Sequence, residues 1–358
     1  ENPDQTVFDQ AYQALTIVPG SDLDKVTNSF DVSTTLRGGV TAKWTSDKPA
    51  TAAIREGTEG TARVVISRPE SDQADVTVKL TAKVTYKEIT KDKEFTIVVL
   101  KKPVITGGYT IAQLRSGSAD LNSAVTISSE VTVVGLAYNG YTVFDGTTAL
   151  FVFTSTAPSV KVGDKGVLYG TFIVNFETNY QLKDATFEKT GEVENVTAPE
   201  VEIKDLWLGA LENEEAVLAR HSGENSVPNF VTVEGKVALR KDLASSGNYQ
   251  LVVFDKDEDA ATSTENFVRL YYRDPLFSEL YALQGKEVKI TLTVSSIRKD
   301  RNASPEYVYE MNITKYQLLQ ELTDEEKVNV DIEVLELNTT FIKDGNLNLV
   351  TKGVQGST

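Results

Sequence analysis

Apolar and polar side chains alternate over many short stretches of this chain. In residues 76–86 an apolar side chain at every even position alternates with threonine or lysine at every odd one. Because successive side chains of a strand point to opposite faces of a sheet, this pattern predicts a strand with one buried face. Shorter strand signals, separated by turn-forming residues, lie at 41–45, 62–67 and 94–100. Residues 1–102 are therefore predicted to form a β-rich unit, with a short helix at 5–15 near its start.

Three stretches of this first unit resemble a known kind of domain. They read KWTSD at 43–47, VTVKLTAKVTY at 76–86 and KEFTIVV at 93–99. Together they resemble the atypical, or atrophied, bacterial immunoglobulin-like domain of surface and secreted proteins, and the resemblance covers nearly all of residues 1–102. It implies an immunoglobulin-like sandwich in which Trp44 fills the core, and an extracellular or cell-surface location.

Residues 103–198 contain five short strand patterns after a short predicted helix at 111–114. The strands are predicted at 131–136, 141–145, 149–154, 165–174 and 184–189, with glycines at the breaks. Five short strands of this kind predict a small closed barrel. The stretches VTVVG at 131–135, YTVFDG at 141–146 and VKVGDK at 160–165 resemble the OB-fold domains of bacterial extracellular proteins.

Residues 199–316 repeat these features in diverged form. VTVEGKV at 231–237 repeats the 131–135 stretch, 249–254 repeats 141–144, and 285–292 repeats 163–168. A last strand is predicted at 307–313, and a leading helix at 205–219. The repetition predicts two OB-like barrels in tandem.

Residues 317–358 carry mixed signals. Thr323 with Glu326 is a capping-box pattern, whereas residues 328–334 alternate as a strand does. Residues 346–358 compare with 31–41, which predicts the opening of a second, incomplete immunoglobulin-like domain. The chain could be truncated there, the remainder could be disordered, or a neighbouring molecule could complete the domain. In the last case Leu347, Leu349 and Val350 are candidates for a strand shared between subunits.

The predicted fold class is thus all-β with minor helix: a sandwich at 1–102, barrels at 103–198 and 199–316, and a partial domain at 317–358. The sequence has no cysteine, which excludes disulfides, thiolate metal sites and cysteine nucleophiles. The net charge is −16 and no domain-sized segment is basic, so nucleic acid is not expected as a partner. No run approaches the roughly 20 apolar residues that span a bilayer.

No catalytic residues are predicted. The P-loop, GxGxxG, HExxH and GxSxG patterns are all missing from the sequence. The single histidine, His221, lies in a polar stretch at 219–226 and is expected to be a solvated loop residue. A catalytic triad would need a nucleophile and an orienting carboxylate beside it in space, and adjacency to Ser222 does not supply that geometry.

Two sets of residues are candidates for binding. Asp255, Asp257 and Asp259 could offer carboxylates to calcium, although the glycine and the closing glutamate of an EF-hand loop are replaced by Ala260 and Asn266. The alternative is a solvated acidic turn. Tyr138, Tyr271 and Tyr272 are candidates for stacking on bases or sugars, the alternative being barrel core with incidental surface tyrosine. No cofactor other than calcium is expected.

These observations favour a non-enzymatic extracellular or cell-surface structural and interaction protein. It could be a fibre or surface-layer subunit completed by strand donation, with other copies of itself among its protein partners. The alternative is binding of single-stranded nucleic acid or glycan by an OB fold, as an accessory module of a secreted hydrolase.

Overall fold

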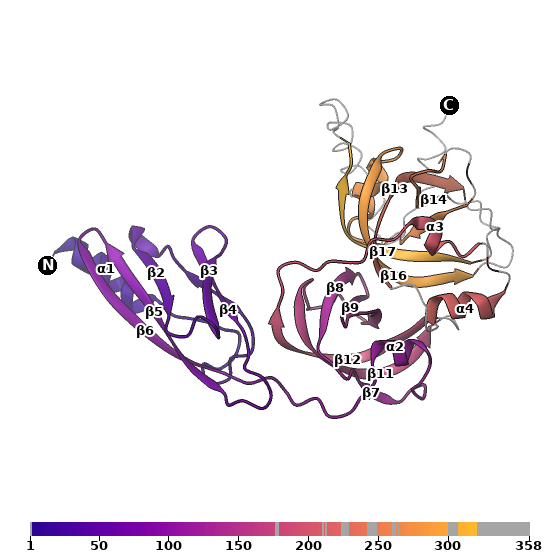
Figure 1. The fold of residues 1–358 in the computed structure, drawn as a ribbon. Coiled ribbons are helices and arrows are strands. Elements are labelled where there is room, and N and C mark those ends of the chain that lie inside the picture. Colours follow the sequence, from indigo (N-terminus) through magenta and orange to yellow (C-terminus); the bar gives the residue numbers. More distant parts are fainter. Residues whose placement is uncertain are drawn as a thin grey trace. The chain divides into compact units, whose positions relative to one another are not determined.

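The computed structural model describes residues 2–175, 179–209, 211, 213–222, 229–241, 249–259, 263, 265–271, 273–299 and 307–320. Strands dominate, and the predicted all-β class with minor helix is confirmed (Figure 1). The chain divides into two compact units. The first comprises Glu1–Thr106 with Asp164–Val167 and Phe187–Val193, and the second comprises the remainder.

The first unit is a helix followed by two three-stranded sheets. Helix α1 (Pro3–Ala14) begins with a proline, and the side chain of Asn2 accepts a hydrogen bond from the Asp4 amide at 3.0 Å. The sheets have the orders β1 (Phe30–Ser33)-β4 (Thr61–Ile66)-β3 (Ala52–Glu56) and β2 (Thr41–Ser46)-β5 (Val76–Tyr86)-β6 (Ile89–Val99), with a short 3-10 helix η1 (Arg37–Gly39) before β2.

Trp44 lies in the core between the two sheets and contacts both of them. Its side chain is 5% exposed on β2, and its indole nitrogen donates to the Ser33 carbonyl of β1 at 2.8 Å. The ring lies 5.5 Å from that of Phe95 on β6. A buried tryptophan needs such a partner for its N–H. The prediction that Trp44 fills the core is confirmed.

The carboxyl end of α1 is held by a lysine from β6. The Lys93 ammonium donates to the carbonyls of Tyr12 at 2.7 Å, Gln13 at 3.2 Å and Leu15 at 2.8 Å. These carbonyls have no partner within the helix, so a cation here satisfies them and complements the helix dipole. Burial lowers the pKa of Lys93.

The next five strands close into a ring, which we call the first barrel. Helix α2 (Ile111–Arg115) and β7 (Ala124–Thr126) precede β8 (Val131–Ala137), β9 (Gly140–Phe144), β10 (Ala149–Phe153), β11 (Asp164–Asn175) and β12 (Asn179–Glu192). The sheet order is β12-β10-β9-β8-β11-β7, and a further pairing of β12 with β11 closes the ring. The β10–β12 pair is parallel.

The last described strands form a closed barrel, the second barrel, with the order β13-β14-β15-β17-β16. Its elements are α3 (Ile203–Leu206), α4 (Glu214–Ser222), β13 (Phe230–Lys241), β14 (Tyr249–Asp255), β15 (Phe267–Leu270), α5 (Phe277–Ala282), β16 (Glu287–Lys299) and β17 (Tyr307–Leu318). The β15–β17 pair is parallel. Both barrels therefore connect their strands in the same order.

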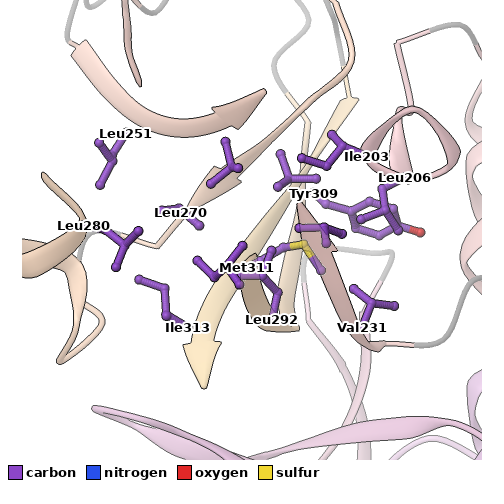
Figure 2. Packing of buried hydrophobic residues seen from close by; sticks show 14 of the residues in the cluster. Ile203, Leu206, Val231, Leu251, Leu270, Leu280, Leu292, Tyr309, Met311 and Ile313 are labelled. Carbon is purple, nitrogen blue, oxygen red and sulfur yellow. The ribbon is translucent and has the colours of Figure 1, made fainter. Parts of the chain in front are cut away.

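The second barrel is filled by apolar side chains from every strand and from α3 to α5. Figure 2 shows Leu251, Leu270, Leu292 and Met311 among those that meet inside it. The single helix predicted at 205–219 is wrong: the segment contains two helices, α3 and α4, separated by residues 207–213. None of the helices in the described part of the chain is both long and apolar enough to cross a membrane.

Candidate functional site at the joint between two barrels

The outer surface of the first barrel packs against the second barrel. Strand β8 contacts β16 and β17, and β10 contacts β16. Figure 1 shows β8 next to β16 and β17. Val134, Ala149, Ala198 and Phe230 form one buried apolar cluster there, and Phe144 meets Phe230 edge-on at 5.3 Å. We call this contact region, which also includes the residues described in the next three paragraphs, the joint.

Two β-bulges meet in the joint. The pairing of β8 shifts at Val134, and that of β17 shifts at Thr314. The Thr314 hydroxyl donates to the Val134 carbonyl at 3.0 Å. A Cβ on Gly135 would lie 3.0 Å from side-chain atoms of Thr293 and Thr314. The glycine therefore allows the strands of the two barrels to approach closely.

Two predicted stacking residues come together at the edge of the joint. Tyr138, in the turn between β8 and β9, stacks on Tyr271, which follows β15, with ring centroids 6.0 Å apart. Arg273 lies 4.9 Å from the centre of the Tyr138 ring and donates to its hydroxyl at 2.8 Å, from 135 residues away in sequence. Tyr138 is still 41% exposed. Tyr272 lies outside the described residues.

Arg115 joins the first barrel to the second from the last turn of α2. Its guanidinium donates to the Asn229 side-chain oxygen at 3.1 Å, to the His221 carbonyl and to the Thr148 hydroxyl. Burial lowers the pKa of Arg115 to about 10. No sequence signal marks this residue, because an arginine in the last turn of a helix is equally common on a solvated surface.

The expectation that His221 is a solvated loop residue is wrong. His221 lies in the last turn of α4 and is 4% exposed, with its ring 5.8 Å from that of Tyr309. Burial, with a smaller effect of the Arg115 charge, lowers the pKa of His221 to about 3. The imidazole is therefore neutral at pH 7. The neighbouring residues in sequence are polar, so the sequence did not indicate that His221 is buried. The burial comes from the first barrel and β17.

The acidic loop after β14 is partly structural. Asp255 is buried, and its two carboxylate oxygens accept from the Asp257 amide at 3.1 Å and the Lys204 amide of α3 at 3.3 Å. Asp257 and Asp259 are exposed. Within the described ranges, no three His, Cys, Asp or Glu side chains are grouped as metal ligands would be. The solvated-turn interpretation is wrong for Asp255, and calcium binding stays a prediction.

Asp274 has a perturbed pKa for a structural reason. It follows the segment that carries Tyr271 and Arg273, and its oxygens accept from the Leu276 amide at 2.9 Å and the Ile313 amide at 2.6 Å. Burial raises the pKa of Asp274 to about 7. Raised carboxyl pKa values often mark catalytic acids. Here one oxygen accepts from the Ile313 amide, next to the bulge at Thr314, and the other from the Leu276 amide, so the carboxyl fastens the start of α5 to β17.

The comparisons with known proteins identify the first unit. Residues 8–102 match the family model described as the atrophied bacterial Ig domain. The resemblance of residues 1–102 is confirmed by this match. A comparison with curated proteins finds no match.

A comparison with solved structures finds a multidomain protein with nucleic acid binding domains from Streptococcus pneumoniae TIGR4. It is 12% identical, with 78% of this chain and 80% of that chain covered, at a TM-score of 0.13. A likeness at that score carries no argument about fold or function.

Proposed function

We propose that this chain is a non-enzymatic structural and interaction protein of the bacterial cell surface or extracellular space. The match of residues 8–102 to the atrophied bacterial Ig domain is the observation that carries the proposal. The joint adds support, because Tyr138 and Tyr271, which were the best candidates for ligand contact, engage each other and hold two barrels together. In this proposal the domains act as spacers and contact surfaces.

The absence of cysteine gives a direct test of location. A single Thr45→Cys change on the exposed face of β2 would introduce the only thiol of the chain. We expect a maleimide reagent that cannot cross membranes to label this variant on intact cells of the native bacterium. A Val143→Cys variant is the matched control, because Val143 is buried and should react only after denaturation. Labelling of Thr45→Cys only after cell lysis would refute the surface location.

The finer proposal is that both barrels are OB-like. Each has the strand order 1-2-3-5-4 with a parallel pairing of its third and fifth strands, which supports a common Greek-key barrel. Proteins of that architecture bind oligonucleotides or glycans on the outer face of the second and third strands, so such binding is the second candidate function.

Two observations make the binding function the weaker candidate. In the first barrel, Thr142 and Ala149 on the corresponding face are at most 1% exposed, and the joint is built there. In the second barrel, Phe254 and Phe267 on this face are buried, with the Trp207 ring 4.9 Å from that of Phe267. The net charge of −16 also repels phosphates.

A titration with single-stranded DNA separates the two candidates. We expect no binding in the micromolar range at moderate salt. Micromolar binding that weakens steeply with salt would favour the second candidate, because displaced counterions accompany real phosphate contacts. Tyr138→Ala should then reduce the affinity, with Tyr169→Ala as the matched exposed control.

A further part of the proposal concerns assembly. Residues 346–358, which carry Leu347, Leu349 and Val350, lie outside the described residues, and in sequence they compare with 31–41. The latter segment includes most of β1, an edge strand that pairs with β4. We propose that the equivalent segment is donated to a neighbouring copy, a heterologous contact that builds fibres.

Electron microscopy of two variants tests strand donation. Deletion of residues 323–358 should abolish polymers, and Leu347→Asp with Leu349→Asp should do the same by placing charges on the buried face of the donated strand. Asn346→Asp with Asn348→Asp alters the other face and should leave polymers intact. Unchanged polymers after the deletion would end the assembly proposal without affecting the surface location.

A further inference from the structure

Four ionisable side chains from three elements lie near one another beside the joint. They are Arg115 of α2, Arg220 and His221 of α4, and Tyr309 of β17, which we call the Tyr309 cluster. His221 and Tyr309 are 4% and 1% exposed, and their rings are 5.8 Å apart. Figure 2 shows Tyr309 packed among core side chains, with its hydroxyl oxygen at the edge of that group.

Three members of the Tyr309 cluster each have a buried polar atom without a hydrogen-bond partner in the part of the chain that the structure describes. These atoms are the Tyr309 hydroxyl, Nδ1 of His221 and Nε of Arg220. Buried polar groups in proteins are almost always satisfied, because removing them from water without a partner costs free energy. A hydroxyl, a ring N–H and a guanidinium N–H are all able to donate. The group that would satisfy all three together is therefore an acceptor.

The charges around Tyr309 favour a negative acceptor. Burial raises the pKa of Tyr309 to about 12, and the positive charges of Arg115 and Arg220 oppose that rise. The charge of Arg115 also helps to keep His221 neutral. A guanidinium pairs well with carboxylate, phosphate and sulfate oxygens, which accept several hydrogen bonds at once.

We propose that the Tyr309 cluster binds a small free oxyanion of the phosphate or sulfate class. The Tyr309 hydroxyl, Arg220 Nε and His221 Nδ1–H donate to its oxygens, and the guanidinium of Arg115 adds a positive field from the first barrel. The anion thus connects α4 and β17 of the second barrel to α2 of the first. The contact between the two barrels would then depend on the anion, and no sequence motif predicts this dependence.

Anion binding is linked to the protonation of His221. Arg115 is the charged group that acts on the imidazole, and Asp145 raises the pKa of Arg115. Arg220 and Arg115 act on Tyr309, which is the neutral neighbour. A bound oxyanion stabilises the imidazolium, so it raises the pKa of His221. By the same linkage, the affinity for the anion rises as the pH falls.

The only histidine of the chain makes this directly measurable. The NMR signals of the His221 ring would be followed in the full chain during titration with inorganic phosphate or sulfate, against chloride at equal ionic strength. We expect a saturable shift with either oxyanion and an upward displacement of the histidine titration curve. Signals that do not move, or that move equally with chloride, would overturn the proposal and indicate that buried water satisfies the three atoms. Acetate serves as a third arm, and a response to acetate alone would point to a protein carboxylate as the natural acceptor and overturn a free phosphate-class ligand.

Two variants locate the site. Tyr309→Phe keeps the ring and removes one donor, and Arg220→Gln removes a charge with its Nε donor. Each should weaken oxyanion binding roughly tenfold or more, because a hydrogen bond to a charged group is lost. Tyr169→Phe and Arg37→Gln, both at exposed positions, are the matched controls and should bind as the parent does. Equal binding by all four variants would also overturn the proposal, and the titration of the parent protein stands if a variant fails to fold.

Discussion

The two barrels share a strand order, yet the same sequence feature has different roles in them. A Val-Thr-Val-x-Gly stretch ends at Gly135 in β8 and at Gly235 in β13. A side chain at Gly135 would meet Thr293 and Thr314 of the other barrel, whereas one at Gly235 would meet the Phe254 carbonyl and Ile203 of its own barrel. One glycine serves the joint and the other serves the packing of α3 onto the barrel.

The outer faces of the barrels differ in the same way. The first barrel covers the face of β8 to β10 with its neighbour, through Val134, Ala149 and Phe230. The second barrel has an apolar cluster of Val252, Phe254 and Phe267 on its own face, packed with Trp207 and crossed by Arg240 at 4.2 Å from the Phe267 ring. A shared topology therefore leaves open what a given face contacts, because the covering groups come from elsewhere in the chain.

The largest expected effect is a loss of stability in acid, which follows from the burial of His221 in the second barrel. The folded-state pKa of His221 is about 3, below the 6.5 of an unperturbed histidine, so the folded state resists protonation. The unfolding free energy should fall as the pH drops from 6.5 towards 3, by an upper limit of roughly 4–5 kcal/mol. Urea unfolding in chloride buffers free of oxyanions measures this. His221→Gln should lose less stability over the same interval, and identical acid dependence of the two proteins would contradict the assignment.

The next effect tests the internal glycine. In Gly235→Ala the new Cβ would lie 2.2 Å from the Phe254 carbonyl oxygen, which is backbone and cannot turn aside. We expect a loss of about 3 kcal/mol or more in the unfolding free energy, measured by urea denaturation. Gly285→Ala controls for backbone strain, because Gly285 has φ +80 and no atom near its missing Cβ. A larger loss at Gly285 would mean that conformation outweighs crowding.

The glycine of the joint should give a smaller and more local effect. Gly135→Val places a branched side chain against Thr293 and Thr314, and we expect a loss of about 2 kcal/mol with faster amide exchange in β8 and β17. Exchange in the first unit should not change. Gly191→Val, in β12 of the same barrel, is the control, because no atom lies within 4 Å of its missing Cβ and its φ is not positive. Unchanged exchange across β8 and β17 would show that Gly135 does not govern the joint.

The smallest expected effect concerns the aromatic contact. Tyr138→Ala removes the stacking on Tyr271 and the Arg273 interaction, and should cost about 1 kcal/mol in thermal or urea unfolding. Tyr169→Ala removes a tyrosine of similar exposure, 44%, and is expected to cost less than about 0.5 kcal/mol. Equal costs would mean that the Tyr138 contact adds nothing beyond surface coverage.

Much of the fold was predictable from local pattern. The alternation at 76–86 coincides with β5, and the immunoglobulin-like resemblance of 1–102 agrees with the family match at 8–102. Tyr138 and Tyr271 were candidates for stacking on bases or sugars, and in the structure they stack on each other. The helix at 205–219 was mispredicted because its apolar spacing continued past the end of α3 and into α4.

The sequence alone determined the fold class of this protein. Alternating apolar residues and glycine turns set strands and turns through contacts within a few residues, and the lack of cysteine excludes disulfides. Only the tertiary structure decided that His221 is buried, that Arg115 reaches Asn229 and that Asp255 supports α3. Those outcomes depend on partners up to 114 residues away. The sequence around a side chain does not show which distant element will bury it. Burial and the local electrostatic field depend on residues that only folding brings together.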